Sequence, residues 1–406
     1  MIGYALYYVI RKNLSIAMPL LGEIGISKVQ LGAFLTCGGI VYGIGRFVNG
    51  IVADRNSARK VMALGLVLCS LVNVAFGCLP AVAWMMGMLW IVNSYFQGMG
   101  VGPCIKTLPQ WFPPEELSTK QSIWNLSHSV GAGAVFALCG WFLIPAFHSW
   151  RLCFIVPAAI ALVGAVAILF LFKDSPTELG FHPTSNLSSG TSSPVEQPFN
   201  SSTAYRAYVW EHVFRNPRVW TIAVADFFVY TVRFAALDWG VVLLMETKGL
   251  SLVQATTLCF VFEIIGGNCG MVAAGWATDR FFGSRAHRTS VFCLLGAAVS
   301  IAAFWLVPVS APLMVKLVPF MAIGFFIYGP QALLGVATTQ QATPQAAGVA
   351  GGFVGIFSYG STALSGLGFG FVAQRWGWSA AYATIFVAAL VGCGVLLLIW
   401  RDAKRG

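Results

Sequence analysis

The sequence predicts an all-α membrane protein with twelve transmembrane helices in two pseudo-symmetric six-helix halves. Of the 406 residues, 58% are hydrophobic and 9% are charged, and the mean hydropathy is +0.78, whereas soluble domains carry about 25% charged residues. Apolar runs of helical length recur about twelve times between short polar turns, and open sheets cannot satisfy their backbone in lipid. Motifs of the first half also return in the second half at a nearly constant offset.

The charges and the cysteines argue against several other classes of protein. The net charge of +10 comes mostly from cations in short loops, so it indicates membrane topology and not nucleic-acid binding. The ten cysteines are scattered singly without a C-x-x-C pair, which is typical of small buried hydrophobes and not of a disulfide framework or a metal site. We expect no cofactor and no cleavable signal peptide, and the first helix would serve as the insertion signal.

The first apolar run, residues 1–21, contains two adjacent cations, Arg11 and Lys12. A cation near the centre of a transmembrane helix costs about 2.5 to 3.5 kcal/mol on insertion scales, so it usually faces a polar interior and has a function. Tyr7 and Tyr8 lie four and three residues before Arg11, on roughly the same face, where their hydroxyls can join the guanidinium around an anion. The alternative is that both cations lie at a membrane boundary and snorkel.

A second copy of this pattern favours the functional interpretation. Tyr230 and Arg233 repeat Tyr8 and Arg11 inside another apolar run at the same offset, 230 − 8 = 233 − 11 = 222. Two intramembrane arginines at matching positions of two halves indicate one site on a pseudo-symmetry axis.

A charged loop after the second apolar run is also duplicated. Residues 50–60 have the pattern G-x-x-x-D-R-x-S-x-R-K, which resembles the signature between helices 2 and 3 of the major facilitator superfamily. Its aspartate can cap or pair at helix ends with its arginines, in a cluster that one conformation makes and another breaks. The core of the loop returns in the second half with an offset of 279 − 54 = 225. The signature residues are Gly50, Asp54, Arg55, Arg59, Asp279 and Arg280.

Two further pairs support the internal repeat. Gly102-Pro103 returns as Gly329-Pro330, with 329 − 102 = 227, and Trp150 returns as Trp378, with 378 − 150 = 228. Four pairs at nearly constant offset predict two parallel halves with the substrate site between them near the midplane.

The apolar pattern also divides the chain into three parts. We expect an N-terminal six-helix bundle at residues 1–172, a cytoplasmic linker at 173–215, and a C-terminal bundle with a short basic tail at 216–406. Small polar residues fill 184–194, which is typical of a flexible linker. A short amphipathic piece near 205–214 is expected on the membrane surface.

The basic residues predict the orientation. In the twelve-helix threading, fourteen lysines and arginines fall on one side and four on the other, so the first side is cytoplasmic. Both termini are then cytoplasmic, in a multi-pass protein of the cell inner membrane. Because Met1 lies so close to the first helix, the sequence leaves open whether Met1 is the true start. The larger group is Arg55, Arg59, Lys60, Lys120, Lys173, Arg206, Arg215, Arg218, Arg280, Arg285, Arg288, Arg401, Lys404 and Arg405, and the smaller is Lys28, Arg151, Lys248 and Arg375.

Several motifs together carry a family resemblance over essentially the whole chain. Y-Y-V-I-R-K-N, F-Q-G-M-G-V-G-P-C, W-N-L-S-H-S-V-G, V-Y-T-V-R-F-A-A-L-D-W and F-I-Y-G-P-Q-A-L-L-G look like the organophosphate:phosphate antiporters, which include the bacterial glycerol-3-phosphate and hexose-6-phosphate exchangers. The resemblance implies the major facilitator fold. It also implies that Arg11 and Arg233 bind the phosphoryl group, and it maps three further phosphate-binding positions to His128, Lys12 and Tyr230.

The chemistry of the residues agrees with this implication. Arginine stays charged and offers a planar fork of donors, so two forks from opposite halves can clamp a dianion. Without an anion they would repel each other, which favours exchange over uniport. His128 has two interpretations: a core histidine hydrogen-bonded across helices, or a donor that gains charge near phosphate.

Other charged residues in or near the apolar runs are candidates for substrate contact or charge balance. Arg46 is either a cation that lines a cavity or a structural partner of an acid. Asp226, Asp238 and Glu263 can counterbalance the cations. Asp226 lies seven residues before Arg233, on roughly the same face, so it can pair with that arginine while the site is empty.

The leading hypothesis is a secondary antiporter, and not an enzyme, that exchanges inorganic phosphate for an organic phosphate ester. A first alternative is a membrane receptor of the same fold that senses sugar phosphate. A second is a proton-coupled organic anion symporter, which requires an essential intramembrane carboxylate such as Glu263 or Asp226. We expect a monomer in the lipid bilayer, and the sequence leaves the identity of the ester open.

Overall fold

The computed structural model describes residues 1–112, 114–180, 202–342 and 346–401. All regular elements within these ranges are helices. The chain divides into two compact units, which we call unit 1 (Met1–Pro194) and unit 2 (Val195–Gly406). The division falls inside the predicted linker at 173–215, whose low-complexity part at 184–194 lies outside the described residues.

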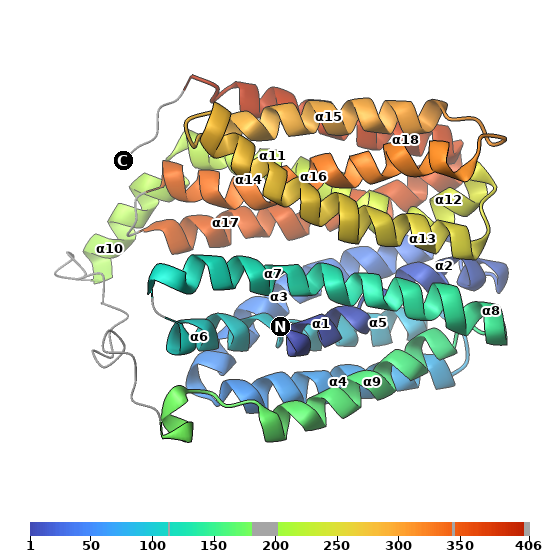
Figure 1. The fold of residues 1–406 in the computed structure, drawn as a ribbon, viewed down its shortest axis with the longest axis horizontal. Coiled ribbons are helices and arrows are strands. Elements are labelled where there is room, and N and C mark those ends of the chain that lie inside the picture. The colour runs from blue at the N-terminus through green and yellow to red at the C-terminus, as the bar shows by residue number, and fades with distance from the viewer. Residues whose placement is uncertain (113, 181–201, 343–345, 402–406) are drawn as a thin grey trace. The chain divides into compact units, whose positions relative to one another are not determined.

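Unit 1 is the blue-to-green part of the chain in Figure 1. Its helices are α1 (Ile2–Val9), α2 (Asn13–Glu23), α3 (Lys28–Arg55), α4 (Ala58–Cys78), α5 (Ala83–Gln97), α6 (Val101–Trp111), α7 (Pro114–Ala137), the π-helix η1 (Leu138–Leu143), α8 (Ile144–Phe147), α9 (Leu152–Leu171) and the 3-10 helix η2 (Pro176–Leu179).

Unit 2 continues from green to red in the same figure. Its helices are α10 (Ser202–Val209), the π-helix η3 (Trp210–Phe214), α11 (Pro217–Asp238), α12 (Gly240–Lys248), α13 (Leu252–Val261), the π-helix η4 (Phe262–Gly267), α14 (Asn268–Phe281), α15 (Ala286–Leu306), α16 (Leu313–Gln341), α17 (Ala347–Gly360), the π-helix η6 (Ala363–Gly368) and α18 (Phe369–Leu397). The amphipathic piece expected at 205–214 is helical, because it falls in α10 and η3.

Nine helical stretches in the described part of the chain are long and apolar enough to cross a membrane. The expected first helix is interrupted between α1 and α2, and the expected fourth is divided into α5 and α6. In contrast, the stretch Val349–Leu397 is 49 residues long and contains Gly377, whose φ of 79° marks a kink between two helices. The helical membrane fold is confirmed, and the count of twelve stays a prediction.

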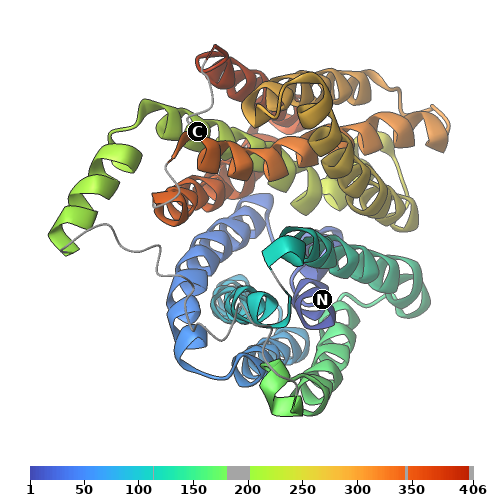
Figure 2. The ribbon, with the colours of Figure 1, turned by 60° about the vertical axis from the view of Figure 1, so that its left-hand side comes forward.

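Helix packing repeats from one unit to the other. In unit 1, α1 packs against α7, α3 against α5, and α4 against α9. The helices of unit 2 that correspond to these by the repeat offset pack in the same pairs: α11 against α17, α14 against α16, and α15 against α18 (Figures 1 and 2). The repeat that the sequence predicted is therefore a repeat of tertiary structure within each unit.

A duplicated capping box adds a repeat that the sequence analysis missed. The Ser27 hydroxyl accepts the Gln30 backbone N–H (3.2 Å) before α3, and the Ser27 N–H donates to the Gln30 side chain (2.9 Å). Ser251 and Gln254 make the same two bonds at 3.3 and 3.1 Å before α13. The offset, 251 − 27 = 254 − 30 = 224, matches the repeat, and the box satisfies N–H groups that a helix start leaves unpaired.

The signature loop between α3 and α4 is held by groups from other helices. The Lys106 ammonium on α6 donates to the carbonyls of Ala53 (3.0 Å) and Asn56 (2.8 Å), at the C-terminal end of α3. The backbone N–H of Arg59 donates to the Asp174 carboxylate (2.7 Å), which lies just after α9. A carboxylate at this helix start is favourable because it meets the positive end of the helix dipole.

The structure describes the surroundings of only one of the two signature aspartates. The side chains of Asp54 and Arg55 lie outside the description, so their pairing stays a prediction. In unit 2, the Asp279 carboxylate accepts the Ser284 hydroxyl (2.8 Å), and Arg280 is exposed. Gly50 has open space around its α-carbon.

The contact between α1 and α7 depends on Gly131. A Cβ at this position would lie 2.2 Å from the Ala5 carbonyl oxygen and 2.8 Å from the Tyr8 Cβ, closer than side chains can approach. Small residues allow such backbone contact between membrane helices. The contact also brings the Tyr8 ring within 5.5 Å of the His128 ring, edge to face.

We therefore expect Gly131→Ala to destabilise the protein by about 1 to 3 kcal/mol through overpacking. The measurement is thermal unfolding in detergent. Gly394→Ala in α18 is the matched control, because a Cβ there meets nothing within 4 Å. Equal melting temperatures for the two variants would contradict the assigned close contact.

Candidate functional site

Arg11 lies in a break of the first apolar run. Helix α1 ends at Val9 and α2 begins at Asn13, so Ile10, Arg11 and Lys12 form a turn between them. The expectation of one continuous helix through residue 11 was wrong. The helical bond from the Leu14 N–H to the Ile10 carbonyl is replaced, because the Leu14 N–H donates to the Asn13 side chain at 3.0 Å.

The Arg11 guanidinium lies over aromatic rings. Its central carbon is 3.8 Å from the centroid of the Tyr42 ring on α3 and 5.4 Å from that of Tyr8 on α1. A cation over an aromatic face is stabilised by about 0.5 to 2 kcal/mol, more when water is excluded. The structure therefore places Tyr42 beside Arg11 within unit 1.

The two tyrosines before Arg11 have different roles. The Tyr8 ring faces Arg11, as the helical spacing predicted. The Tyr7 hydroxyl instead donates to the Met62 carbonyl on α4 at 2.9 Å, and the side chain is buried. Tyr7 is therefore a packing residue, and its predicted role beside the guanidinium was wrong.

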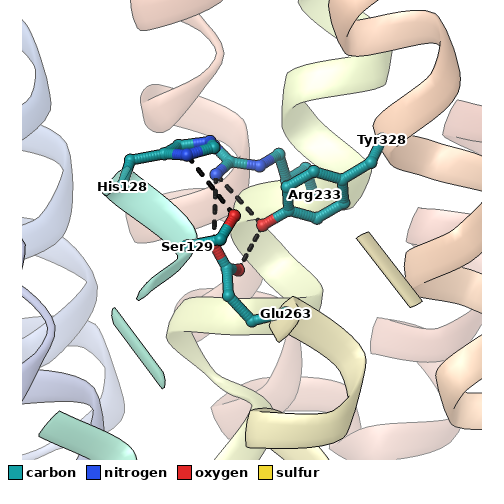
Figure 3. Close-up of polar contacts among 5 residues, drawn as sticks. All are labelled: His128, Ser129, Arg233, Glu263 and Tyr328. Carbon is teal, nitrogen blue, oxygen red and sulfur yellow. Dashed lines mark hydrogen bonds and ion pairs between the residues drawn. The ribbon is translucent and has the colours of Figure 1, made fainter. Parts of the chain in front are cut away.

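His128 and Lys12 belong to the same part of unit 1. The His128 ring on α7 is buried and stacks edge to face against the Tyr8 ring at 5.5 Å. Its Nδ1 atom lies 3.4 Å from the Ser129 hydroxyl (Figure 3). Lys12 is buried at the start of α2. Unit 1 thus places Arg11 and His128 next to the same ring, that of Tyr8, and their role in phosphate binding stays a prediction.

Arg233 in unit 2 has a carboxylate partner. It lies in the uninterrupted helix α11, whose break comes later, at Trp239. Its guanidinium donates to the Tyr328 hydroxyl of α16 at 3.1 Å and lies 3.9 Å from the Glu263 carboxylate of η4. The Tyr328 hydroxyl in turn donates to Glu263 (Figure 3). These three buried side chains form what we call the Arg233 triad.

The aromatic surroundings of Arg233 are looser than those of Arg11. Its central carbon lies 4.7 Å from the Tyr328 ring centroid, 5.6 Å from Phe234 and 6.0 Å from Tyr230. Tyr230 is half-buried, and its ring lies 6.4 Å from that of Tyr359 on α17. The predicted proximity of Tyr230 to Arg233 is present, but the closest ring belongs to Tyr328.

The remaining charged candidates lie in other environments. The carboxylate of buried Asp226 accepts the Ser358 hydroxyl of α17. The acid beside Arg233 in the triad is therefore Glu263 and not Asp226.

The other two charged candidates lie apart from the triad. Asp238 is half-buried at the last position of α11, and Arg46 is exposed on α3. In the ranges that the structure describes, His, Cys, Asp and Glu form no group of three that could hold a metal ion.

The two arginine environments differ in charge. Aromatic faces attract the Arg11 cation without cancelling its charge, whereas Glu263 supplies a formal negative charge close to Arg233. Charge-assisted hydrogen bonds to oxygen are the strong interactions of both guanidiniums. The charge of Arg11 is therefore available to an anion, whereas an anion at Arg233 has to compete with the Glu263 carboxylate.

The chain matches the Major Facilitator Superfamily over residues 1–366. It is 35% identical over 408 residues to the glycerol-3-phosphate transporter of Bacillus subtilis, with 100% of this chain and 91% of that protein covered. It is 33% identical over 399 residues to the membrane sensor protein UhpC of Salmonella typhimurium, covering 98% and 89%. A probable hexose phosphate transport protein of Chlamydia trachomatis is 31% identical over 417 residues, covering 100% and 90%.

Two solved structures share the fold. A bacterial homolog of the human lysosomal transporter Spinster has a TM-score of 0.73 at 16% identity, covering 98% of this chain and 93% of that one. The nucleoside transporter NupG, in a mutant form, has a TM-score of 0.75 at 13% identity and covers 98% of each chain. At these identities the likeness concerns the fold alone.

The Arg233 triad leads to a prediction about stability. Glu263→Leu should destabilise the protein by about 3 kcal/mol, because it leaves a buried guanidinium without its carboxylate. Arg233→Leu combined with Glu263→Leu should be less destabilised than Glu263→Leu alone. The test is a double-mutant cycle on thermal unfolding in detergent. Additive losses from the two substitutions would show that the pair is not coupled.

Proposed function

Because the chain belongs to the Major Facilitator Superfamily and, within it, to the organophosphate:phosphate antiporter family, we propose that it exchanges inorganic phosphate for an organic phosphate ester by alternating access. It is a multi-pass membrane protein of a transporter family and not an enzyme. The ester belongs to the glycerol-3-phosphate or hexose-6-phosphate class, after the proteins to which the chain is similar.

The observation that carries this proposal is the duplicated arginine within an apolar run. Arg11 and Arg233 occupy matching positions of the repeat, and neither is fully exposed: Arg11 is half-buried and Arg233 is 4% exposed. Cations in such places are costly unless they serve a polar ligand. A phosphoryl group is the ligand that both substrates of the exchange share.

The surroundings of Arg11 support a phosphate-binding role. Phosphate oxygens are recognised by the N–H groups in the guanidinium plane, whereas the Tyr42 ring contacts the guanidinium face. The two interactions are therefore compatible. His128 and Lys12 add a potential donor and a positive charge in the same part of unit 1, as the family resemblance implies.

The triad supports a related role for Arg233. Glu263 and Tyr328 already offer oxygen atoms to its guanidinium. A phosphoryl group offers the same chemistry with more negative charge, so it can take over these contacts. Tyr230 lies at the edge of this group. We assign Arg11, Arg233, His128, Lys12 and Tyr230 to phosphate binding.

Two observations favour alternatives. The likeness to UhpC, a membrane sensor protein, supports a receptor that binds sugar phosphate without transporting it. The buried Glu263 carboxylate in η4 supports proton coupling. For any of these functions we propose a monomer with both termini in the cytoplasm, as the basic loops indicate.

The function is tested in proteoliposomes loaded with labelled inorganic phosphate. External glycerol-3-phosphate, hexose-6-phosphates and phosphoglycerates are added one at a time, and phosphate efflux is followed. Exchange predicts that the transported ester accelerates efflux without an imposed proton gradient. Ester binding without accelerated efflux would favour the receptor, and a strict requirement for a proton gradient would favour the symporter.

We predict that Arg11→Lys and Arg233→Lys each reduce phosphate exchange at least about a hundredfold, because lysine keeps the charge but loses the bidentate fork. Arg206→Lys is the matched control, because Arg206 is exposed on α10 outside the apolar runs, and it should retain most of the activity. Membrane insertion is checked by the yield of monodisperse protein. Normal exchange by both variants would refute the proposed site.

A second prediction concerns Tyr42. Tyr42→Phe keeps the ring beside Arg11 and should exchange phosphate with nearly normal KM. Tyr42→Leu loses the aromatic face and should raise the phosphate KM by about three- to tenfold, in line with the strength of cation–π contacts. Kinetics in proteoliposomes measure both values, and equal KM values for the two variants would remove Tyr42 from the site.

A further inference from the structure

Four buried amide side chains surround the break beside Arg11. Asn13 belongs to α2, Asn73 to α4, and Asn93 and Gln97 to α5. Their exposed fractions are 0%, 2%, 2% and 3%. Buried amides are costly unless their hydrogen bonds are satisfied, so a group of four in apolar helices calls for a physical reason.

Three of these amides converge on one backbone oxygen. The Ile10 carbonyl oxygen lies 3.2 Å from the Gln97 amide nitrogen and 3.4 Å from those of Asn73 and Asn93, and the Asn73 nitrogen reaches it in addition to its two shorter bonds. In a continuous helix this carbonyl would accept the Leu14 N–H. The amides of α4 and α5 thus supply the partners that the helix itself no longer provides.

The same side chains are linked to one another. The Asn13 amide donates to the Asn73 side-chain oxygen at 2.8 Å and to the Cys153 carbonyl of α9 at 3.1 Å. The Asn73 amide donates to Asn93 at 3.0 Å and to the Cys69 carbonyl at 2.9 Å. Because Asn13 also accepts the Leu14 N–H, both the donor and the acceptor of the missing helical bond are satisfied.

We infer that Asn73, Asn93 and Gln97 are positioning residues, which hold the helix break at Ile10 open and thereby set the direction of Arg11. Residue 11 follows the held carbonyl directly, so the orientation of that peptide fixes where its side chain starts. The part of this inference that concerns phosphate rests on the function proposed above. The part that concerns the geometry of the break does not.

A simpler explanation is that the amides only tie helices together, as polar residues do in many membrane proteins. Asn49 is a suitable comparison. It is a buried amide on α3 that donates to the Tyr95 carbonyl on α5 at 3.2 Å and makes no hydrogen bond to Ile10. Loss of Asn49 should weaken helix packing without changing the direction of Arg11.

The first experiment measures the orientation of position 11 without using transport. Arg11→Cys is placed in a full-length chain whose native cysteines are replaced, and its labelling rate with a water-soluble methanethiosulfonate is recorded. Adding Gln97→Met, which keeps length but removes the donor, should change this rate by about fivefold or more. Adding Asn49→Leu should leave the rate within about twofold.

The second experiment measures phosphate exchange in proteoliposomes with Arg11 intact. Gln97→Met should raise the phosphate KM by about tenfold, with a smaller change in the rate at saturating phosphate. Asn49→Leu should lower the melting temperature by a similar amount but leave KM nearly unchanged. If Gln97→Met is not recovered as monodisperse protein, Asn93→Leu replaces it, because leucine has a similar volume but no amide to donate to Ile10.

The outcomes test separately whether the amides position Arg11 and whether Arg11 binds phosphate. Unchanged labelling of position 11 in Gln97→Met, or in Asn93→Leu where that variant replaces it, would overturn the positioning role. Changed labelling together with a raised phosphate KM supports the whole inference. Changed labelling with an unchanged KM supports positioning of the break and overturns the assignment of Arg11 to phosphate.

Discussion

Lipid offers no hydrogen-bond partner, so every backbone group that leaves the helical pattern in an apolar span must find one in the protein. In unit 1 this constraint centres on the Ile10 carbonyl, which receives three side-chain amides from α4 and α5. The Tyr7 hydroxyl adds a second tie from α1 to α4. The packing of α1, α4 and α5 and the position of the first intramembrane arginine therefore depend on the same few bonds.

The internal repeat preserves the arginines but not their surroundings. Arg11 lies in a turn against the Tyr42 ring, and Arg233 lies in a continuous helix beside Glu263. A carboxylate reduces the positive potential that an approaching anion experiences, whereas an aromatic ring does so much less. Two positions that are equivalent by sequence thus differ in how strongly they attract an anion.

The sequence predicted the helical membrane fold, the repeat and the approach of Tyr8 to Arg11, because these follow from composition and from short helical spacings. The place of His128 in the same group does not follow from spacing, and it came from the family resemblance. The sequence did not predict the break at Ile10, since the amides that hold it lie 63 to 87 residues away along the chain. The sequence named Glu263 as a candidate acid. It did not predict that Glu263, and not Asp226, pairs with Arg233, because helical spacing favours the acid that is nearer along the chain. The contact between Tyr328 and Arg233, across 95 residues, is likewise a product of tertiary packing.

The π-helices η1 and η6 occupy equivalent positions of the two halves, which bears on how the internal repeat arose. They span Leu138–Leu143 and Ala363–Gly368, so both their first and last residues are related by 363 − 138 = 368 − 143 = 225, within the range of offsets of the repeat. A π-helix is a rare irregularity that fits one additional residue into a helix. Its occurrence at the same place in both halves is most simply explained by inheritance, so the additional residue was already present in the ancestral half before its gene was duplicated.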